Sequence, residues 1–212
     1  MKIRNLLTEP WIRIAGMLVV GSLLLVSGCK KESPPQSDHE KAIAGYEKVD
    51  ADIRARYGAN ADSLLFRQGV YHALATAGVT NLLKCNISHE AFQPVDEDWV
   101  TGAYSVELNR VLFDVGVLNQ YRGVSLNCED FALGATFVAK ALHLKAPGRV
   151  PETSPAFGYI YYRPEDPAAD KAAHAINFAL LKNGSVLFYE PQSRLRVRLT
   201  ASEIASIYFW EL

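Results

Sequence analysis

The spacing of the hydrophobic residues changes near residue 157, and this change limits the folds available to the chain. Between residues 37 and 145, apolar residues recur three or four positions apart, which is the spacing of the buried side of an α-helix. Beyond residue 156 the chain consists of short runs rich in β-branched and aromatic residues, which cover residues 157–162, 174–181, 185–189 and 195–199. Helices that precede an antiparallel sheet predict an α+β domain.

Four helices are predicted before the sheet. The first begins at the capping-box pair Ser37 and Glu40 and ends at Gly58. The second is expected over residues 62–77 and the third over residues 96–114. The fourth begins at Cys128, because Asn127 is a favourable N-cap, and its buried side is expected to consist of Phe131, Ala135, Val138 and Leu142. Residues 145–156 are predicted to form a loop, and a short helix is expected to begin at Ala201.

The first 28 residues predict a signal peptide. Basic residues precede an apolar run from residue 14 to residue 26, which is too short to span a bilayer comfortably. The run ends in Val26-Ser27-Gly28-Cys29, which resembles a bacterial lipobox, in which the cysteine carries acyl chains such as palmitate and becomes the mature N-terminus. A plain secretory signal and an uncleaved anchor helix are the alternatives. The predicted organisation is a signal peptide over 1–28, a lipidated tether over 29–37 and a single domain over 38–212.

The net charge and the residue after the lipobox indicate which partners and which cellular location to expect. The chain has 22 basic and 23 acidic side chains and a net charge of −1, with no basic block, which argues against a nucleic-acid binder. Lys30 follows Cys29, whereas lipoproteins kept at the inner membrane often have Asp there. The expected location is therefore the bacterial cell envelope, lipid-anchored at the outer membrane and facing the periplasm, where disulfides persist.

Cys128, His174 and Glu190 form a candidate reactive group. A thiol becomes a strong nucleophile as a thiolate, which the N-terminus of a helix stabilises. Such a thiolate needs an imidazole as its proton partner, and the imidazole needs a polar group that orients it. His174 begins a predicted strand and Glu190 ends the next one.

The turn between these two strands decides whether His174 and Glu190 can meet. A two-residue loop at Asn183-Gly184 sets Glu190 opposite Asn177, on the wrong face for His174. A three-residue loop over 182–184, with Gly184 in a left-handed conformation, sets His174 opposite Gln192 and diagonal to Glu190 on the same face. The candidate group therefore requires the longer, bulged turn.

Three short motifs carry a resemblance to a known family. Asn-Cys-Glu-Asp-Phe-Ala-Leu at 127–133, His-Ala-Ile-Asn-Phe at 174–178 and Tyr-Glu-Pro-Gln at 189–192 together resemble the papain/transglutaminase-like cysteine hydrolases. The chain looks most like the C-terminal cysteine-protease domain of fungal agglutinins and related bacterial and phage proteins. It is also similar to bacterial transglutaminase-like cysteine peptidases. The similarity covers about residues 115–195, and the signature around the cysteine of true papains is absent.

The resemblance implies a papain/transglutaminase-like core and a lipid-anchored envelope hydrolase acting on a peptide or protein substrate. In this family's reaction, acyl transfer at a peptide or amide bond, Cys128 would be the nucleophile. His174 would be the general base and then the general acid, and Glu190 the orienting group. The backbone N–H of Cys128 and the side chain of Gln120 would stabilise the oxyanion, with a solvated loop position as the alternative for Gln120.

A calcium site beside the cysteine is the one cofactor considered. Asp130 lies at the third position of the predicted helix, where its carboxylate favours the helix dipole and can cap the N-terminus. Some relatives bind calcium through such acidic groups. No other metal or cofactor is expected.

Two alternatives to the hydrolase remain open. In one, Cys128 forms a disulfide with Cys85, the other cysteine left after lipidation of Cys29, and the bridge makes the group inert. In the other, the chain is a non-enzymatic lipoprotein that serves as a binding or assembly module on the same scaffold. The reactivity of Cys128 discriminates between these possibilities.

Overall fold

The structure is a computed structural model that describes residues 38–120, 126–165 and 173–212. The predicted signal peptide, the lipid-bearing Cys29 and the tether lie outside these residues. Among the described residues, no helix has both the length and the apolar character needed to cross a membrane.

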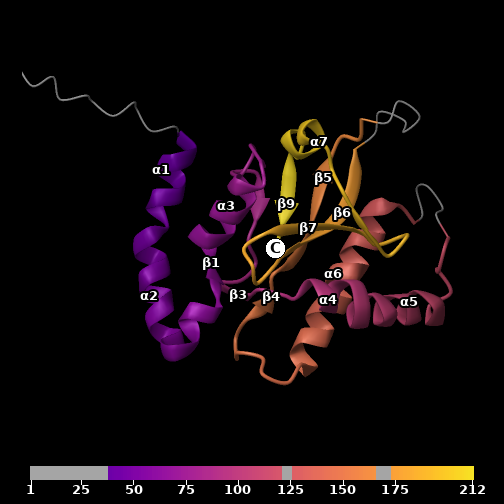
Figure 1. Ribbon diagram of the computed structural model, residues 1–212, viewed down its shortest axis with the longest axis horizontal. Helices are drawn as coiled ribbons and strands as arrows, with labels where there is room; N and C mark the ends of the chain where they lie inside the picture. The colour runs from indigo at the N-terminus through magenta and orange to yellow at the C-terminus, as the bar shows by residue number, and fades with distance from the viewer. Residues whose placement is uncertain (1–37, 121–125, 166–172) are drawn as a thin grey trace, which may run out of the picture. The chain divides into compact units, whose positions relative to one another are not determined.

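The larger of two sheets has six strands in the order β2-β9-β5-β6-β7-β8 (Figure 1). Its strands are β2 Cys85–Asn86, β5 Phe157–Tyr162, β6 His174–Leu180, β7 Val186–Glu190, β8 Leu195–Val197 and β9 Phe209–Glu211. All neighbours are antiparallel except β2 and β9. The smaller sheet consists of β1 Leu65–Phe66, β3 Ala91–Gln93 and β4 Ser154–Pro155. Helices together with a mainly antiparallel sheet confirm the predicted α+β class, whereas the papain/transglutaminase-like core is not confirmed.

The helices differ from the prediction mainly at the N-terminal end. The α-helices are α1 Asp38–Gly45, α2 Glu47–Tyr57, α3 Arg67–Thr76, α4 Glu97–Trp99, α5 Ser105–Asp114, α6 Cys128–Lys145 and α7 Ala201–Ala205. The first predicted helix is divided between α1 and α2 and ends at Gly58, whose positive φ of 52° ends the helical backbone. The second predicted helix begins only at Arg67, because residues 58–66 form a 3₁₀ turn and strand β1. The third is continuous over 97–114 through a π turn at Val100–Tyr104.

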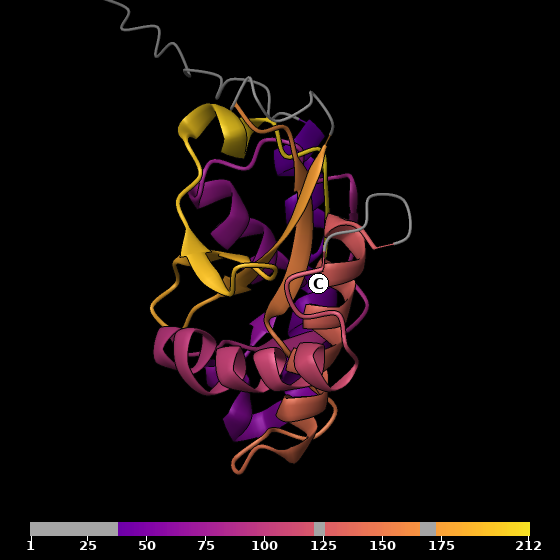
Figure 2. The same ribbon diagram turned by 90° about the vertical axis from the view of Figure 1, so that its right-hand side faces the viewer.

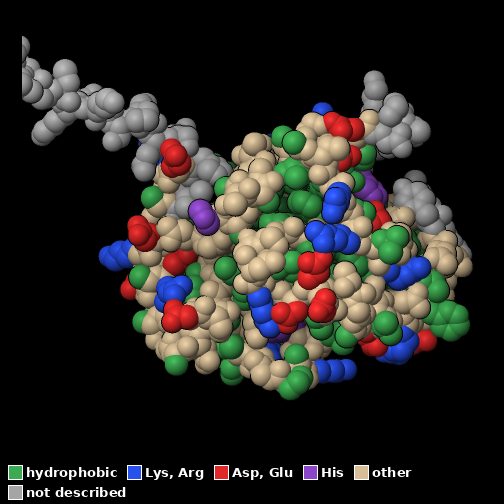
Figure 3. Space-filling view, in the orientation of Figure 1, with side chains coloured by type: hydrophobic (Ala, Val, Ile, Leu, Met, Phe, Trp, Pro, Cys, Tyr) green, Lys and Arg blue, Asp and Glu red, His purple; other side chains and the backbone are tan. Residues whose placement is uncertain are grey.

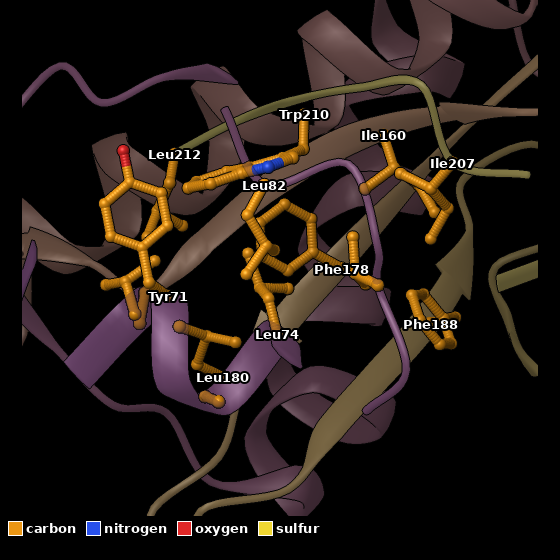
Figure 4. Packing of buried hydrophobic residues seen from close by; sticks show 14 of the residues in the cluster. Tyr71, Leu74, Leu82, Ile160, Phe178, Leu180, Phe188, Ile207, Trp210 and Leu212 are labelled. Atoms are coloured by element: carbon orange, nitrogen blue, oxygen red, sulfur yellow. The ribbon is translucent and has the colours of Figure 1, made fainter. Parts of the chain in front are cut away.

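The six-stranded sheet has helices packed on both faces, and the alternation of side chains along the strands explains why (Figure 2). Even-numbered strand residues such as Ile160, Phe178 and Trp210 pack with α3, as Figure 4 shows in part. Odd-numbered residues such as Phe157, Ala179, Leu187 and Tyr189 pack with α5 and α6. The predicted buried side of α6 is confirmed for Phe131, Ala135 and Val138, while Leu142 is half-buried at the edge of the same cluster.

The hairpin that joins β6 and β7 has the longer turn. Asn177 lies opposite Tyr189 and Leu180 opposite Val186, which is the register of the three-residue loop. Gly184 has a φ of 82°, the left-handed conformation that this turn requires. The condition under which His174 and Glu190 share a face is therefore met.

Strand β9 was not predicted as a strand. The sequence shows a short apolar stretch there, but β9 lies inside the sheet, between β2 and β5. Gly158 of β5 permits this approach, because a Cβ atom at residue 158 would lie 1.9 Å from the carbonyl oxygen of Glu211.

The N-terminus of α6 is closed by a reciprocal cap. The side chain of Asn127 accepts hydrogen bonds from the N–H groups of Glu129 and Asp130, at 2.8 and 3.3 Å, and the Asp130 carboxylate accepts from the N–H of Asn127 at 2.9 Å. This arrangement confirms the predicted start of the helix at Cys128 and the capping role of Asp130.

Replacing Asn127 by Ala is expected to lower the free energy of unfolding by about 1 kcal/mol, because two helix N–H groups lose their acceptor. Urea denaturation monitored by circular dichroism measures the change. Asn127→Ser, which keeps a capping oxygen, is the control and should lose less than half as much. Equal losses in the two variants would show that the cap is not the cause.

Candidate active site

Three elements bring Cys128, His174 and Glu190 together at one end of the six-stranded sheet. Cys128 is the first residue of α6, His174 is the first residue of β6, and Glu190 is the last residue of β7. Because all three lie at element ends, their side chains are half-buried instead of enclosed between the sheet and its helices.

His174 and Glu190 form an ion pair that fixes the orientation of the imidazole. The Nε2 atom of His174 lies 2.7 Å from Oε2 of Glu190, and the two side chains are 28% and 17% exposed. The other carboxylate oxygen of Glu190 accepts the backbone N–H of Gln192 at 3.1 Å. With both oxygens engaged, Glu190 holds the ring so that Nδ1 is left for a second partner.

That second partner is Cys128, and the pair favours separated charges. The hydrogen bond with His174 lowers the pKa of the Cys128 thiol; burial opposes this, while the N–H groups of Ala175 and Glu129 and the charge of His174 lower the pKa further. Burial lowers the pKa of His174, but the hydrogen bonds and the charges of Cys128 and Glu190 outweigh it and raise the pKa to about 9. Both shifts favour transfer of the thiol proton to the imidazole, which leaves the sulfur as a thiolate.

Aromatic rings lie near Cys128 on the α6 side of the sheet. Cys128, Tyr161 and Phe209 each pack against a buried cluster that consists of Ala132, Tyr159 and Ala175. The centroid of the Tyr161 ring lies 5.7 Å from that of Tyr159 and 5.7 Å from that of Phe209. This wall has a polar side as well, because the hydroxyl of Tyr159 donates to the Glu211 carboxylate at 3.0 Å.

Asn177 is a site-supporting residue that the sequence analysis did not single out. It is fully buried in β6, and its amide nitrogen lies 2.9 Å from the carbonyl of Ala132, 3.0 Å from Oγ1 of Thr136 and 3.0 Å from the carbonyl of Gly158. Asn177 therefore joins the first turns of α6 to the sheet that carries His174. The available signal was an amide within the otherwise apolar run Ile176-Asn177-Phe178, since buried polar groups are rarely left without a structural role.

Gln120 and Asp130 are the remaining predicted site residues. Gln120 is half-buried in the turn after α5, and its backbone N–H donates to the carbonyl of Val117 at 3.0 Å. Its role as an oxyanion donor stays a prediction. Within residues 38–120, 126–165 and 173–212, no group of three or more His, Cys, Asp or Glu side chains is arranged to hold a metal ion. The carboxylate of Asp130 takes part in the helix cap, and calcium binding there stays untested.

The predicted alternative of a Cys85–Cys128 disulfide is wrong. Both cysteines are free. Cys85 pairs with Trp210 in the sheet, and its sulfur lies 3.2 Å from the hydroxyl of Tyr71 on α3. The sulfur of Cys128 is on the α6 side, so the sheet separates the two thiols. The reason for the error is that compartment and cysteine count carry no information about the face on which a side chain lies.

Comparison with known proteins finds structures with a similar fold but assigns the chain to no family. No family model and no curated protein matches the chain. Among solved structures, a complex of PSL1a with E64 is similar at a TM-score of 0.53 and 15% identity, over 71% of this chain and 51% of that chain. The lectin of Polyporus squamosus bound to the epitope Neu5Acα2-6Galβ1-4GlcNAc is similar at a TM-score of 0.54 and 15% identity, over 71% and 50%. The chain thus spans about half the length of these neighbours.

These findings correct the family and the activity expected from the sequence. One of the similar structures is named as a lectin with a bound saccharide and the other as a complex of PSL1a with E64, and neither is named as a papain-like cysteine protease. The prediction of a lipid-anchored cysteine hydrolase or thiol protease is therefore wrong. The ligand of that lectin also differs in class from the peptide substrate that was predicted. The physical reason is that the motifs cover a few residues at element ends. Such residues specify a local arrangement, whereas family and substrate depend on the loops and the rest of the fold.

Proposed function

We propose that this chain is a ligand-binding module that captures an electrophilic ligand on the thiolate of Cys128. The observation that carries the proposal is the geometry of the group: Cys128 begins α6, and Glu190 holds the His174 ring at 2.7 Å. The hydrogen bond with His174 lowers the pKa of the Cys128 thiol and so favours its thiolate. A thiolate is the nucleophilic form of cysteine, and a half-buried one at a helix N-terminus is accessible to small molecules. A binding role also agrees better with the lectin neighbours than a hydrolytic one.

Each residue of the site has a separate part in the capture. The sulfur of Cys128 attacks an electrophilic carbon of the ligand, so that a carbon–sulfur bond forms, the bond from that carbon to its leaving group, such as iodide in iodoacetamide, breaks, and the leaving group takes the electron pair. His174 keeps the sulfur ionised by holding its proton, and Glu190 orients the ring through the 2.7 Å contact with Nε2. The N–H groups of Ala175 and Glu129, which stabilise the thiolate, are placed to stabilise negative charge that moves onto the bound ligand. Gln120 remains a predicted further donor, and the lipid-anchored location in the cell envelope remains a prediction from the N-terminal sequence.

The similar structures suggest which ligands to test first. PSL1a forms a complex with E64, and the Polyporus squamosus lectin binds Neu5Acα2-6Galβ1-4GlcNAc. Both ligands can be offered to the purified full chain, together with iodoacetamide as a general thiol reagent.

Incubation with E64 or iodoacetamide at pH 7 is expected to add one ligand to the chain, on Cys128, as measured by intact mass and peptide mapping. Cys85→Ala should react as the wild type does, because burial raises the pKa of the Cys85 thiol and keeps it protonated. Cys128→Ala should not form this adduct. An unmodified Cys128 would contradict the proposal.

Two further outcomes would also count against covalent capture. One is release of the added ligand in a chemically altered form, which would show turnover instead of binding. The other is binding of the trisaccharide to the wild type and to Cys128→Ala with equal affinity, as measured by calorimetry, without any adduct of the other ligands. That result would place the ligand site elsewhere on the chain.

A further inference from the structure

The surroundings of Cys128 contain an aromatic surface that the capture step itself does not use. Tyr161 occupies its centre, and the rings of Tyr159, Tyr208 and Phe209 have centroids 5.7 to 5.9 Å from its own. Tyr161, Tyr208 and Phe209 are half-buried, so each ring keeps part of its surface open to solvent. Packing alone does not require aromatic residues at partly exposed positions.

Carboxylates border this aromatic surface next to the sulfur. Glu129 follows Cys128 in the chain, is exposed, and accepts a hydrogen bond from Tyr161. Glu211 accepts from the hydroxyl of Tyr159 at 3.0 Å and from the side-chain amide of Asn86 at 3.1 Å. Because the hydroxyls donate to carboxylates, the negative charge lies at the edge of the rings.

The charges around the surface do not cancel. Within the reactive group, the positive charge of His174 is paired with Cys128 and Glu190. Glu129 raises the pKa of Tyr208 while Arg163 lowers it, so both charges reach that ring. Glu129 also raises the pKa of Tyr159 and of Tyr161 through its charge. Among the residues that the structure describes, two carboxylates, those of Glu129 and Glu211, thus lie beside the rings together with one guanidinium, that of Arg163.

Rings beside unneutralised carboxylates are the recognition elements for an organic cation. The face of a tyrosine ring is electron-rich and attracts an ammonium or guanidinium group, and a nearby carboxylate strengthens the attraction. We infer that the Cys128 site favours ligands with a positive charge and that this charge is held on the rings of Tyr161 and Tyr208 beside Glu129. This inference rests on the proposed capture at Cys128 and adds the ligand class.

Methanethiosulfonates of different charge test the inference on the full chain. The thiolate of Cys128 attacks the sulfenyl sulfur of the reagent, a disulfide bond forms, the sulfur–sulfur bond of the reagent breaks, and methanesulfinate leaves with the electron pair. The 2-aminoethyl reagent is cationic, the 2-sulfonatoethyl reagent is anionic and the methyl reagent is neutral. The rate of modification of Cys128 is followed by mass spectrometry for each, and the cation-to-anion rate ratio is divided by the same ratio for the chain unfolded in urea.

The normalised ratio is expected to be about tenfold or more for the native protein. Glu129→Gln should lower it by about threefold or more, because the side-chain charge is removed, and dividing the cationic rate by the anionic rate cancels any change in the reactivity of Cys128 that is common to both reagents. Tyr161→Leu should also lower the ratio, and Tyr161→Phe, which keeps the ring, should retain most of it. Asp62→Asn is the matched control, because Asp62 is an exposed carboxylate that pairs with Arg54 away from the site, and it should leave the ratio unchanged.

The outcomes separate this inference from the proposed function. A normalised ratio near one, with Cys128 reactive toward all three reagents, would overturn the preference for cations and leave capture at Cys128 standing. If Glu129→Gln and Asp62→Asn lower the normalised ratio equally, the preference for cations comes from the net charge of the protein. This result would overturn the inference that the aromatic surface beside Glu129 holds the cation. Failure of all three reagents to modify Cys128 would overturn both.

Discussion

His174→Ala is expected to slow the alkylation of Cys128 by iodoacetamide at pH 6 by at least about tenfold. The hydrogen bond with His174 is the largest cause of the lowered pKa of Cys128, and burial then raises that pKa without opposition from the imidazole. Each unit by which a thiol pKa exceeds the pH lowers the thiolate fraction about tenfold, and the greater intrinsic reactivity of a more basic thiolate offsets part of that loss.

The pH dependence of Cys128 alkylation shows in which direction His174 shifts the pKa of the thiol. In the wild type the pKa of Cys128 is lowered and that of His174 is raised to about 9, so the reactive ion pair exists between these two values. Reactivity should fall as the pH drops through the lowered pKa of the thiol. In His174→Ala the midpoint of the rate profile should move to higher pH, toward or above that of an ordinary thiol.

Two variants accompany this measurement. His72→Ala removes an exposed imidazole from α3 and should leave the profile unchanged. Glu190→Gln keeps an acceptor for Nε2 without the charge and should move the midpoint part of the way. Superimposable profiles for the wild type and His174→Ala, with iodoacetamide and mass spectrometry as the assay, would show that the imidazole does not control the sulfur.

Trp210→Ala is expected to lower the free energy of unfolding by about 3–5 kcal/mol, which is the usual cost of removing a fully buried aromatic side chain. Trp210 has no exposed surface and lies on the α3 face of the sheet, where its ring contacts those of Tyr71 and Phe178 at 5.6 and 6.4 Å between centroids (Figure 4). Its backbone pairs with both β2 and β5, and these paired strands prevent the structure from filling the cavity that removal of the indole leaves. Urea denaturation followed by circular dichroism measures the loss.

The matched control is Phe137→Ala on α6. The Phe137 side chain is 72% exposed, so its removal should change the free energy of unfolding by less than about 0.5 kcal/mol. Trp210→Phe should fall between the two, because most of the ring volume is kept and a buried indole N–H without a hydrogen-bond partner is removed. A loss for Trp210→Ala no larger than that for Phe137→Ala would show that β9 does not belong to the cooperative core.

Charges of both signs are mixed on the surface, and the absence of a nucleic-acid partner stays a prediction from the composition. On the face drawn in Figure 3, acidic and basic side chains are interspersed. Among the described residues, exposed side chains of opposite charge form pairs, such as Arg196 with Glu97 and Lys182 with Asp96. Interspersed charges of both signs do not form the continuous basic surface that phosphate backbones require.

Much of the reactive group could be predicted because its determinants are local. A capping residue at Asn127 sets the first turn of α6 and hence the position of Cys128. The turn over 182–184, with its left-handed Gly184, sets the register of β6 and β7 and hence the contact of His174 with Glu190. Both signals depend on backbone geometry within a few residues, which amino-acid type restricts strongly.

The errors concern features that depend on distant parts of the chain. Strand β9 was missed because its place inside the sheet depends on Gly158, fifty residues earlier, leaving room for the carbonyl of Glu211. The division of the first predicted helix at Tyr46 was missed as well, since the ring of Tyr46 stacks on that of Tyr71 at 5.4 Å between centroids, a contact with α3 that periodicity does not reveal. The hydrolase assignment failed for a related reason, because local motifs do not specify the family of the whole fold.

The α+β class and the helix cap at Asn127 followed from the order of residues alone, because each is set by interactions between near neighbours in the chain. The sequence allowed two registers for the hairpin between β6 and β7, and the structure has the longer turn. The ionisation of Cys128, its separation from Cys85 and the aromatic surface beside Glu129 were decided only by folding. Each of these depends on which side of the sheet a side chain occupies and on charges brought together from α6, β5, β6, β7 and β9. Electrostatic and packing energies depend on the distances between side chains, and for residues far apart in the sequence these distances are set only by the tertiary fold.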